Sequence, residues 1–447
     1  MTNSPNVLFL VVDSLRADVV VDNESYRTPV LDRLIHEGIV FTNCYAQGIS
    51  TAPSMTAMLT GRYPLEYGGH WHLEENQPTF AEQFQRGGYT TGAFHSNPYV
   101  SSRRNFDRGF DTFEEDVVTF EPDGALESAP QKVLRLLNRL SRIVSRTPYT
   151  PASEVNDQLK SWTARTEQPW FLWTQYMDVH GPYLPGDDFT YWNKFRAEWI
   201  WRKAAVNAPE QISDAEHKEL KRNYRKEVEY LDEEVGNLLD TLEERSKLDE
   251  TIVVVVGDHG DAFNEHGDYG HSNLPYDELI HVPLIIRFPD DAPFEQGQQI
   301  EDIVRCIDIL PTILDYVDVE LEEEMERRMA GESLLPTIKH DESPDFDYCV
   351  TEKRIRGEDA LRIGLRTERW KFLYDGKSEE TFLYDLQVDP DEQKDVSGEH
   401  EEVVEEFTDK LQARLKRIEK TSGSVTIPDL DTDAGVEERL RALGYRE

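Results

Sequence analysis

Three strongly apolar runs divide the chain. They are "NVLFLVVDS" (6–14), "PWFLWTQYMDVH" (169–180) and "ETIVVVVGDHG" (250–260). Continuous apolar runs, unlike alternating ones, are typical of strands that are buried on both faces of a parallel sheet. Helical stretches lie between them, at 28–38 and 221–244. The pattern predicts an α/β fold with a large, mostly parallel, doubly wound sheet.

The pattern changes near residue 345. Short runs at 348–353, 360–375 and 380–387 predict a small antiparallel sheet, and 401–420 predicts one helix that covers it. We therefore expect a catalytic domain, a C-terminal subdomain and a polar tail. The expected boundaries are 1–345 for the catalytic domain, with insertions at 116–160 and 185–220, then 346–420 for the subdomain and 421–447 for the tail.

Charge sets this chain apart more than its hydrophobic content does. With 447 residues, of which 38% are hydrophobic, the chain can bury a large core. Its formal net charge is −40, and acidic and basic residues are mixed along its length. Salt screens such self-repulsion, so we expect a cytoplasm of high ionic strength, as in halophilic archaea. The same charge argues against binding to nucleic acid.

The cysteines and the N-terminus also indicate a cytoplasmic location. Cys44, Cys306 and Cys349 have no metal-ligand spacing and form no even set, which favours reduced thiols. The first apolar run is short and has no basic residues before it, so we interpret it as a strand and not as a signal peptide. No apolar stretch reaches the length that spans a bilayer.

Polar residues able to do chemistry follow each of the three predicted strands. Asp13 follows the first, His180 the second, and Asp258 with His259 the third. Each alone has an ordinary interpretation, as a turn residue, a buried histidine or a helix cap. Ligands of open α/β sheets gather where the carboxyl ends of strands converge. Two carboxylates and an imidazole can bind a divalent cation there, with manganese or zinc favoured and calcium or magnesium possible.

A hydroxyl precedes a short predicted helix in "ISTAPSMTAMLTGRYP" (49–64). Pro53 suits the first helical turn, and Gly61 supplies a stop. Thr51 is then either a helix cap or a nucleophile that faces a phosphate or sulfate ester, because a helix N-terminus favours anions. This stretch by itself leaves both interpretations open.

Several blocks together resemble the sulfatase family of the alkaline-phosphatase superfamily, which consists of metal-dependent ester hydrolases. The blocks are "PNVLFLVVDSLRAD", "TPVLDRLIHEGIVFTNCYAQ", "APSMTAMLTGRYP", "DHGDAFNEHGDYGH" and "YDELIHVPLIIR", and "RWKFLYD" with "LYDLQVDPDEQKDV" resembles the C-terminal subdomain of that family. The resemblance implies a sulfatase-like α/β sandwich.

The resemblance also implies roles for individual residues. The metal ligands of the family fall on Asp13, Asp258 and His259, and its nucleophile, which also contacts the metal, falls on Thr51. His180 matches a histidine that contacts the substrate or protonates the leaving group. The remaining matches are His271, where many relatives carry a lysine, and His72, a substrate-binding position.

Departures from the family pattern point to phosphate chemistry. Sulfatases oxidise a cysteine or serine to formylglycine, and Thr51 cannot form that aldehyde, so no formylglycine is expected. Met55 replaces the arginine of the motif, and Ser14 replaces its second acid. This arrangement resembles the phosphoglycerol and phosphoethanolamine transferase branch. We expect an ester hydrolase or transferase that acts on phosphate or sulfate esters; the alternatives are a strict sulfatase and a binding protein without turnover.

The substrate is expected to be an anionic ester on a small molecule, a glycan or a lipid. The segment "QKVLRLLNRLSRIVSR" (131–146) is basic and amphipathic. It either contacts an anionic membrane surface or packs against the acidic surface of the protein itself.

Overall fold

The computed structural model describes residues 4–21, 26–67, 72–75, 77–116, 149–184, 191–271, 273–355 and 360–421. The predicted basic helix at 131–146 and the tail from 422 lie outside these ranges.

The centre of the molecule is one large sheet, which contains eight strands in the described ranges, in the order β10-β2-β9-β6-β1-β5-β3-β4. Neighbouring strands are parallel, except that β9 runs antiparallel to β2 and β6. The strands are β1 (Asn6–Val12), β2 (Ile39–Tyr45), β3 (Thr90–His95), β4 (Thr112–Glu115), β5 (Trp170–Tyr176), β6 (Thr251–Gly257), β9 (His281–Arg287) and β10 (Gln298–Arg305). A short hairpin is formed by β7 (Ala262–Phe263) and β8 (Tyr269–Gly270). The predicted α/β fold with a mostly parallel sheet is confirmed.

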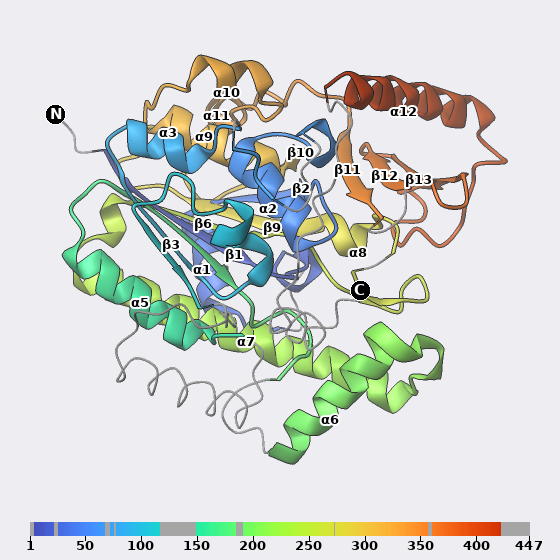
Figure 1. The fold of residues 1–447 in the computed structure, drawn as a ribbon, viewed down its shortest axis with the longest axis horizontal. Helices are drawn as coiled ribbons and strands as arrows, with labels where there is room; N and C mark the ends of the chain where they lie inside the picture. The colour runs from blue at the N-terminus through green and yellow to red at the C-terminus, as the bar shows by residue number, and fades with distance from the viewer. Residues whose placement is uncertain are drawn as a thin grey trace, which may run out of the picture.

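Helices cover both faces of this sheet (Figure 1). One face carries α1 (Pro29–Glu37), α5 (Ala152–Arg165) and α7 (Asp214–Glu244); the other carries α2 (Thr51–Thr60), α3 (Phe80–Arg86) and α9 (Ile309–Tyr316). Successive side chains of β1 alternate between the two resulting cores, because neighbouring side chains of a strand point to opposite faces. The other helices are α6 (Tyr191–Arg202), α8 (Asp277–Ile280), α10 (Glu323–Arg328) and α11 (Leu335–His340).

Helix α7 begins before the residue that the sequence pattern predicts. It starts at Asp214, not at 221, and Ser213 caps it. The Ser213 hydroxyl accepts from the amide of Glu216, and the Glu216 carboxylate accepts from the amide of Ser213. The first turns are largely polar, so apolar periodicity missed them, although this reciprocal cap is a recognisable start signal.

The C-terminal subdomain is a four-stranded antiparallel sheet within the described part of the chain. Its strands are β11 (Cys349–Arg354), β12 (Leu361–Arg366), β13 (Trp370–Asp375) and β14 (Glu380–Asp385), and α12 (Glu401–Thr421) lies over it (Figure 1). Phe372 of the sheet stacks on Phe407 of the helix, with ring centroids 5.6 Å apart. The predicted small sheet and its covering helix are confirmed.

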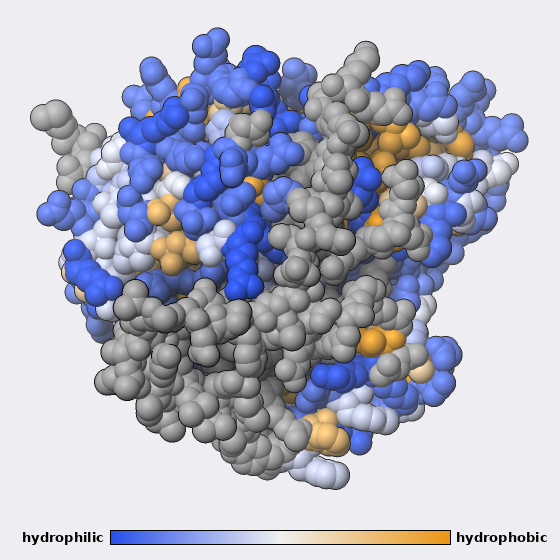
Figure 2. Space-filling view, viewed as in Figure 1, coloured by the Kyte–Doolittle hydropathy of each residue, from blue (hydrophilic) through white to orange (hydrophobic). Residues whose placement is uncertain are grey.

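The visible surface of the described residues is mainly hydrophilic (Figure 2), as the acidic composition requires. The three cysteines are buried free thiols, and the sulfur atoms of Cys44 and Cys306 lie 3.7 Å apart. Among the described helices, none combines the length and the apolar character needed to cross a bilayer.

Candidate functional site

Three adjacent strands of the large sheet bring most of the predicted residues to one edge. Strand β1 lies between β5 and β6, and its last residue, Val12, is in register with Tyr176 and Gly257. Asp13 directly follows β1, and Asp258 directly follows β6. Because the three strands are parallel, their carboxyl ends meet at the same edge, as the sequence pattern predicts.

Asp13, Asp258 and His259 form a cluster of potential metal ligands. One ligand atom from each lies within 4.8 Å of the others, and all three residues are buried. The Nδ1 atom of His259 lies 2.9 Å from the carbonyl oxygen of Gly260. A carbonyl can only accept, so Nδ1 carries a proton and Nε2 is the ring atom left to bind a cation.

That Nε2 atom lies near two carboxylates. His259 Nε2 lies 3.4 Å from Oδ1 of Asp13 and 3.7 Å from Oδ1 of Asp258, and it has no hydrogen-bond partner among the described residues. Burial, and then the charge of Asp13, raise the pKa of Asp258 well above its usual range. A ring nitrogen close to two buried carboxylates fits a divalent cation, because the cation satisfies all three groups.

Amide and hydroxyl groups fix the two carboxylates in place. Asn97 donates to Oδ2 of Asp13 (2.9 Å), and Gln175 donates to Oδ2 of Asp258 (2.9 Å) and to Oδ2 of Asp13 (3.3 Å). The Ser14 hydroxyl donates to Oδ1 of Asp13 (3.2 Å). Sequence reasoning missed Asn97 and Gln175. Asn97 follows β3 and Gln175 lies in β5, so knowledge of the strand order would have pointed to both.

Thr51 is the first residue of α2, and its side chain does not cap the helix. The cap position belongs to Ser50, whose side chain makes no capping bond among the described residues. The Thr51 hydroxyl instead donates to Oδ2 of Asp13 over 3.0 Å. The interpretation of Thr51 as a cap is therefore wrong. The predicted stop is confirmed, since Gly61 ends the helix with φ of 65°.

Three histidine rings lie next to one another at this edge. The ring centroids of His271 and His259 are 4.6 Å apart, and those of His271 and His180 are 5.3 Å apart. Nδ1 of His180 lies 2.6 Å from the carbonyl oxygen of Gly181, which again places the proton on Nδ1. The structure thus joins His180 and His271 to the cluster of Asp13, Asp258 and His259.

An aspartate that sequence reasoning missed holds one of these rings. Asp261 accepts from Nδ1 of His271 (2.9 Å) and from the hydroxyl of Tyr183 (2.7 Å). Burial lowers the pKa of His271 to about 4; Asp261 opposes this shift, while the neighbouring His259 and His180 add to it. His271 is therefore neutral at pH 7. The available signal for Asp261 was its place three residues after Asp258 in "DHGD".

Helix α6 supports the loops that carry these histidines. Trp201 is buried, and its indole packs so closely on Gly181 that an added Cβ would lie 2.3 Å from it. The same indole lies under Gly270, directly before His271. A residue larger than glycine at 181 would displace the turn that holds His180.

His72 interacts with Glu74 and Arg104. It is half-buried, and this burial lowers the pKa of its imidazole. The charge of Glu74 opposes the shift, and the charge of Arg104 adds to it. No contact recorded among the described residues joins His72 to the candidate metal ligands. Its predicted role in substrate binding stays a prediction.

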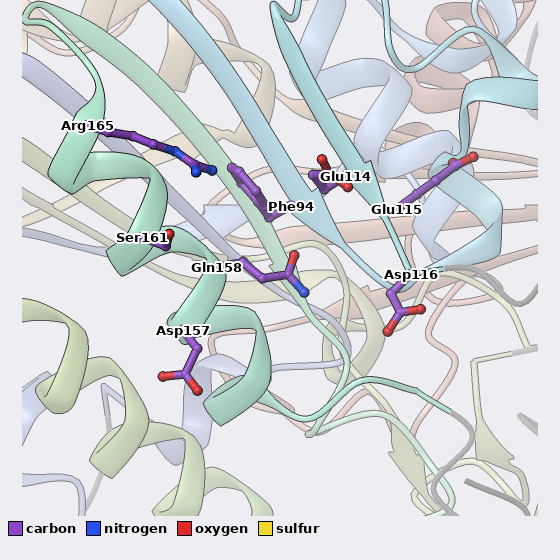
Figure 3. A pocket seen from close by; sticks show the side chains of 8 residues that line it. All are labelled: Phe94, Glu114, Glu115, Asp116, Asp157, Gln158, Ser161 and Arg165. Atoms are coloured by element: carbon purple, nitrogen blue, oxygen red, sulfur yellow. The ribbon is translucent and has the colours of Figure 1, made fainter. Parts of the chain in front are cut away.

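Two hollows of the described surface lie away from this cluster. One, of about 440 Å³, is shown in Figure 3 between β3, β4 and α5; it is lined by Phe94, Glu114, Glu115, Asp116, Asp157, Gln158, Ser161 and Arg165. A second, of about 690 Å³, lies where the large sheet meets the C-terminal subdomain, between Arg16 and Arg366. Neither of these two hollows is lined by a residue predicted for the site, so the chemistry of the cluster is what identifies the candidate site here.

Comparison with protein families agrees with the geometry. The model described as Sulfatase matches residues 5–319, and the model described as N-sulphoglucosamine sulphohydrolase, C-terminal, matches residues 264–421. The chain is 25% identical to the N-acetylglucosamine-6-O-sulfatase of Bacteroides thetaiotaomicron, over 90% of this chain and 84% of that protein.

Solved structures share the fold. The phosphonate monoester hydrolase of Agrobacterium radiobacter superposes with a TM-score of 0.74 at 19% identity, covering 92% of this chain and 96% of that one. A second structure, in complex with its substrate D-glucosamine-2-N,6-O-disulfate, gives a TM-score of 0.70 at 20% identity, covering 93% and 98%. These likenesses confirm the predicted fold class.

Proposed function

The chain belongs to the sulfatase family of ester hydrolases, and on that premise we propose that Thr51 is the nucleophile of a metal-dependent hydrolase or transferase of phosphate esters. The observation that carries this proposal is the 3.0 Å hydrogen bond from the Thr51 hydroxyl to Asp13. Through this bond the hydroxyl lies at the cluster of carboxylates. A capping hydroxyl would instead accept a hydrogen bond from an amide of the first helical turn.

Asp13, Asp258 and His259 would hold the divalent cation, next to Thr51. When bound, the cation lowers the pKa of a hydroxyl and offsets charge on the ester oxygens. The imidazole among the ligands favours manganese or zinc. Asn97 and Gln175 keep the carboxylates oriented, as hydrogen-bonded outer groups do in metal sites.

The chain itself supplies the nucleophile and the proton transfers. Thr51 Oγ1 attacks phosphorus while its proton passes to Asp13, to which it already donates. The amino end of α2 faces the ester oxygens with its positive dipole. The bond from phosphorus to the leaving oxygen breaks, and water or an acceptor alcohol then attacks the phosphothreonine.

His180 is the residue that we assign as general acid. Its Nδ1 proton is directed to Gly181, so the imidazolium form carries the transferable proton on Nε2. His271 is a weaker candidate, because it is neutral at pH 7 and its Nδ1 proton bonds to Asp261. We propose that His271 orients the substrate and that His72 binds it more peripherally.

Hydrolysis of sulfate esters is the second candidate function. The name of the Bacteroides relative and the disulfated sugar in the second structure support it, and they support a sulfated glycan as its substrate. Threonine favours phosphate, because a sulfated threonine lacks the aldehyde hydrate through which sulfatases release sulfate. The charge of −40 supports action in a salt-rich cytoplasm.

The test replaces Thr51. Thr51→Ala is expected to lower turnover of 4-nitrophenyl phosphate by at least about 10³-fold, as loss of a nucleophile does, without changing metal content. Thr51→Ser keeps the hydroxyl and should retain part of the activity. Mass spectrometry of acid-quenched wild-type protein should find phosphate on Thr51.

Thr56→Ala is the matched control. Thr56 is a buried threonine of the same helix whose hydroxyl donates to the carbonyl of Ala52, away from the carboxylates. The Thr56→Ala variant should therefore turn over 4-nitrophenyl phosphate within a few-fold of the wild-type rate. Full activity of Thr51→Ala would overturn the nucleophile, and faster turnover of 4-nitrophenyl sulfate than of the phosphate would favour the sulfatase alternative.

A further inference from the structure

Lys353, at the end of β11, lies beside the candidate site without a carboxylate partner. Its Nζ atom is 3.5 Å from the carbonyl oxygen of His271. Among the described residues, no carboxylate forms an ion pair with it. Burial, and then the charge of Arg362, lower its pKa to about 8, so at pH 7 the ammonium is still mostly protonated.

Lys371, in the same small sheet, is an example of a structural lysine whose charge is balanced by carboxylates of the chain. It is fully buried and forms ion pairs with Asp277 and Glu392. The chain has 88 acidic and 48 basic side chains, so carboxylate partners are plentiful. Lys353 is only partly buried, and a lysine without a carboxylate partner in so acidic a protein is available to an anion from outside.

The direction of β11 turns Lys353 toward the site. Thr351 donates to the carbonyl of Ala46 (2.6 Å), in the segment that leads to Thr51. The intervening Glu352 points the other way and bonds to Arg414 (2.7 Å). Side chains of a strand alternate, so Lys353 shares the face of Thr351. The C-terminal subdomain thus presents a cation between the Thr51 segment and the His271 loop.

We propose that Lys353 binds a second anionic group of the substrate, a carboxylate, sulfate or phosphate carried by the alcohol part of the ester. The proposal rests on the proposed function and narrows its substrate class to esters with an additional negative charge. The ammonium is a point charge on a flexible stem, so it accepts anions from several directions. The low-polarity surroundings that depress its pKa also strengthen its attraction to an anion.

The experiment compares two substrates in two variants. Wild type, Lys353→Met and Lys353→Arg are assayed with 4-nitrophenyl phosphate and with its 3-carboxy derivative, which adds one carboxylate on the leaving group. Lys353→Met should raise KM for the carboxylated ester by at least about tenfold, as loss of a charged hydrogen bond does, with kcat nearly unchanged. KM for 4-nitrophenyl phosphate, which lacks the carboxylate, should change less than threefold, and Lys353→Arg should restore most of the preference.

A binding measurement separates this proposal from the proposed function. Calorimetric titration with phenylphosphonate and 3-carboxyphenylphosphonate measures binding without turnover. Wild type should bind the carboxylated ligand more tightly than phenylphosphonate, and Lys353→Met should bind the two ligands with similar affinity. Equal losses for both ligands or both esters would overturn the proposal and place Lys353 at the reacting group. An unchanged preference in Lys353→Met would overturn it as well, whether or not Thr51 proves to be the nucleophile.

Discussion

Two buried clusters of charged groups in this protein are built in opposite ways. In the first, Arg414 of α12 contacts Glu352 (2.7 Å) and Glu66 (2.8 Å), and so joins the C-terminal subdomain to the large domain. In the second, Asp13 and Asp258 both lie close to Nε2 of His259. The first cluster balances negative charge within the chain, and the second does not.

The difference separates structural from functional burial of charge. A buried ion pair such as Arg414 with Glu352 satisfies both partners without any ligand. Adjacent carboxylates destabilise the folded protein unless something outside the chain neutralises them. The surrounding sheet, which is buried on both faces, provides the stability that keeps such a cluster in place. Unbalanced buried charge therefore points to the candidate site.

The largest expected effect on stability comes from breaking the balanced cluster. Arg414→Met leaves Glu66 and Glu352 buried without their main partner, and it should reduce the free energy of unfolding by about 3–5 kcal/mol. Urea unfolding followed by circular dichroism measures the change.

Arg417 supplies the control for this prediction. It also contacts Glu66 (3.3 Å), but it is 61% exposed, so Arg417→Met should change the free energy of unfolding by less than about 1 kcal/mol. If both variants lost the same stability, the balanced cluster would not be what joins the subdomain to the large domain.

Local sequence patterns predicted the residues that stand at strand ends. Asp13, His180, Asp258 and His259 follow apolar runs, so their convergence needed only the rule that parallel strands share an edge. Asn97 and Gln175 could not be found in this way. They are ordinary polar residues whose contact with Asp13 depends on the order β6-β1-β5-β3, and strand order is set by long-range packing.

Two other residues show the same limit. Thr51 could be read as a cap or as a nucleophile until the structure placed Ser50 at the cap position and Asp13 within reach of the hydroxyl. Lys353 lies about 300 residues along the chain from Thr51 and belongs to a different sheet. Its place beside His271 follows from the docking of the subdomain, which no local pattern encodes.

A smaller effect is expected when the unbalanced cluster receives its cation. Chelator-treated protein should gain about 2.7 kcal/mol in the free energy of unfolding when manganese or zinc is added at 100 times its Kd, because the ion binds only the folded state. Thermal unfolding across a metal titration measures this gain. Asp258→Asn should abolish it, and Arg414→Met should leave it unchanged. A gain that survives in Asp258→Asn would place the ion elsewhere.

The smallest effect concerns Asp178, a buried acid that belongs to neither cluster. Burial raises its pKa to about 7, and the charge of Glu234 adds to this, while the amide of Ala152 donates to Oδ1 (3.1 Å) and opposes it. Glu227, whose own pKa is raised well above its usual range by burial and then by Asp178, faces the same acid. The unfolded pKa is about 3.9, so the folded protein binds the extra proton between roughly pH 4 and 7. The contribution of Asp178 to stability is therefore greatest below about pH 4, falls as the pH rises to about 7, and is constant above it.

Asp178→Asn mimics the protonated acid and keeps an acceptor for Ala152, so it should be more stable than wild type by about 1–2 kcal/mol at pH 8 and no more stable at pH 4. Urea unfolding of both proteins at the two pH values checks this, and because the other acids are the same in both proteins, the comparison isolates the substitution of Asp178. Parallel pH profiles would mean that Asp178 is ionised in the folded state, and that unbalanced buried charge is not confined to the candidate metal site.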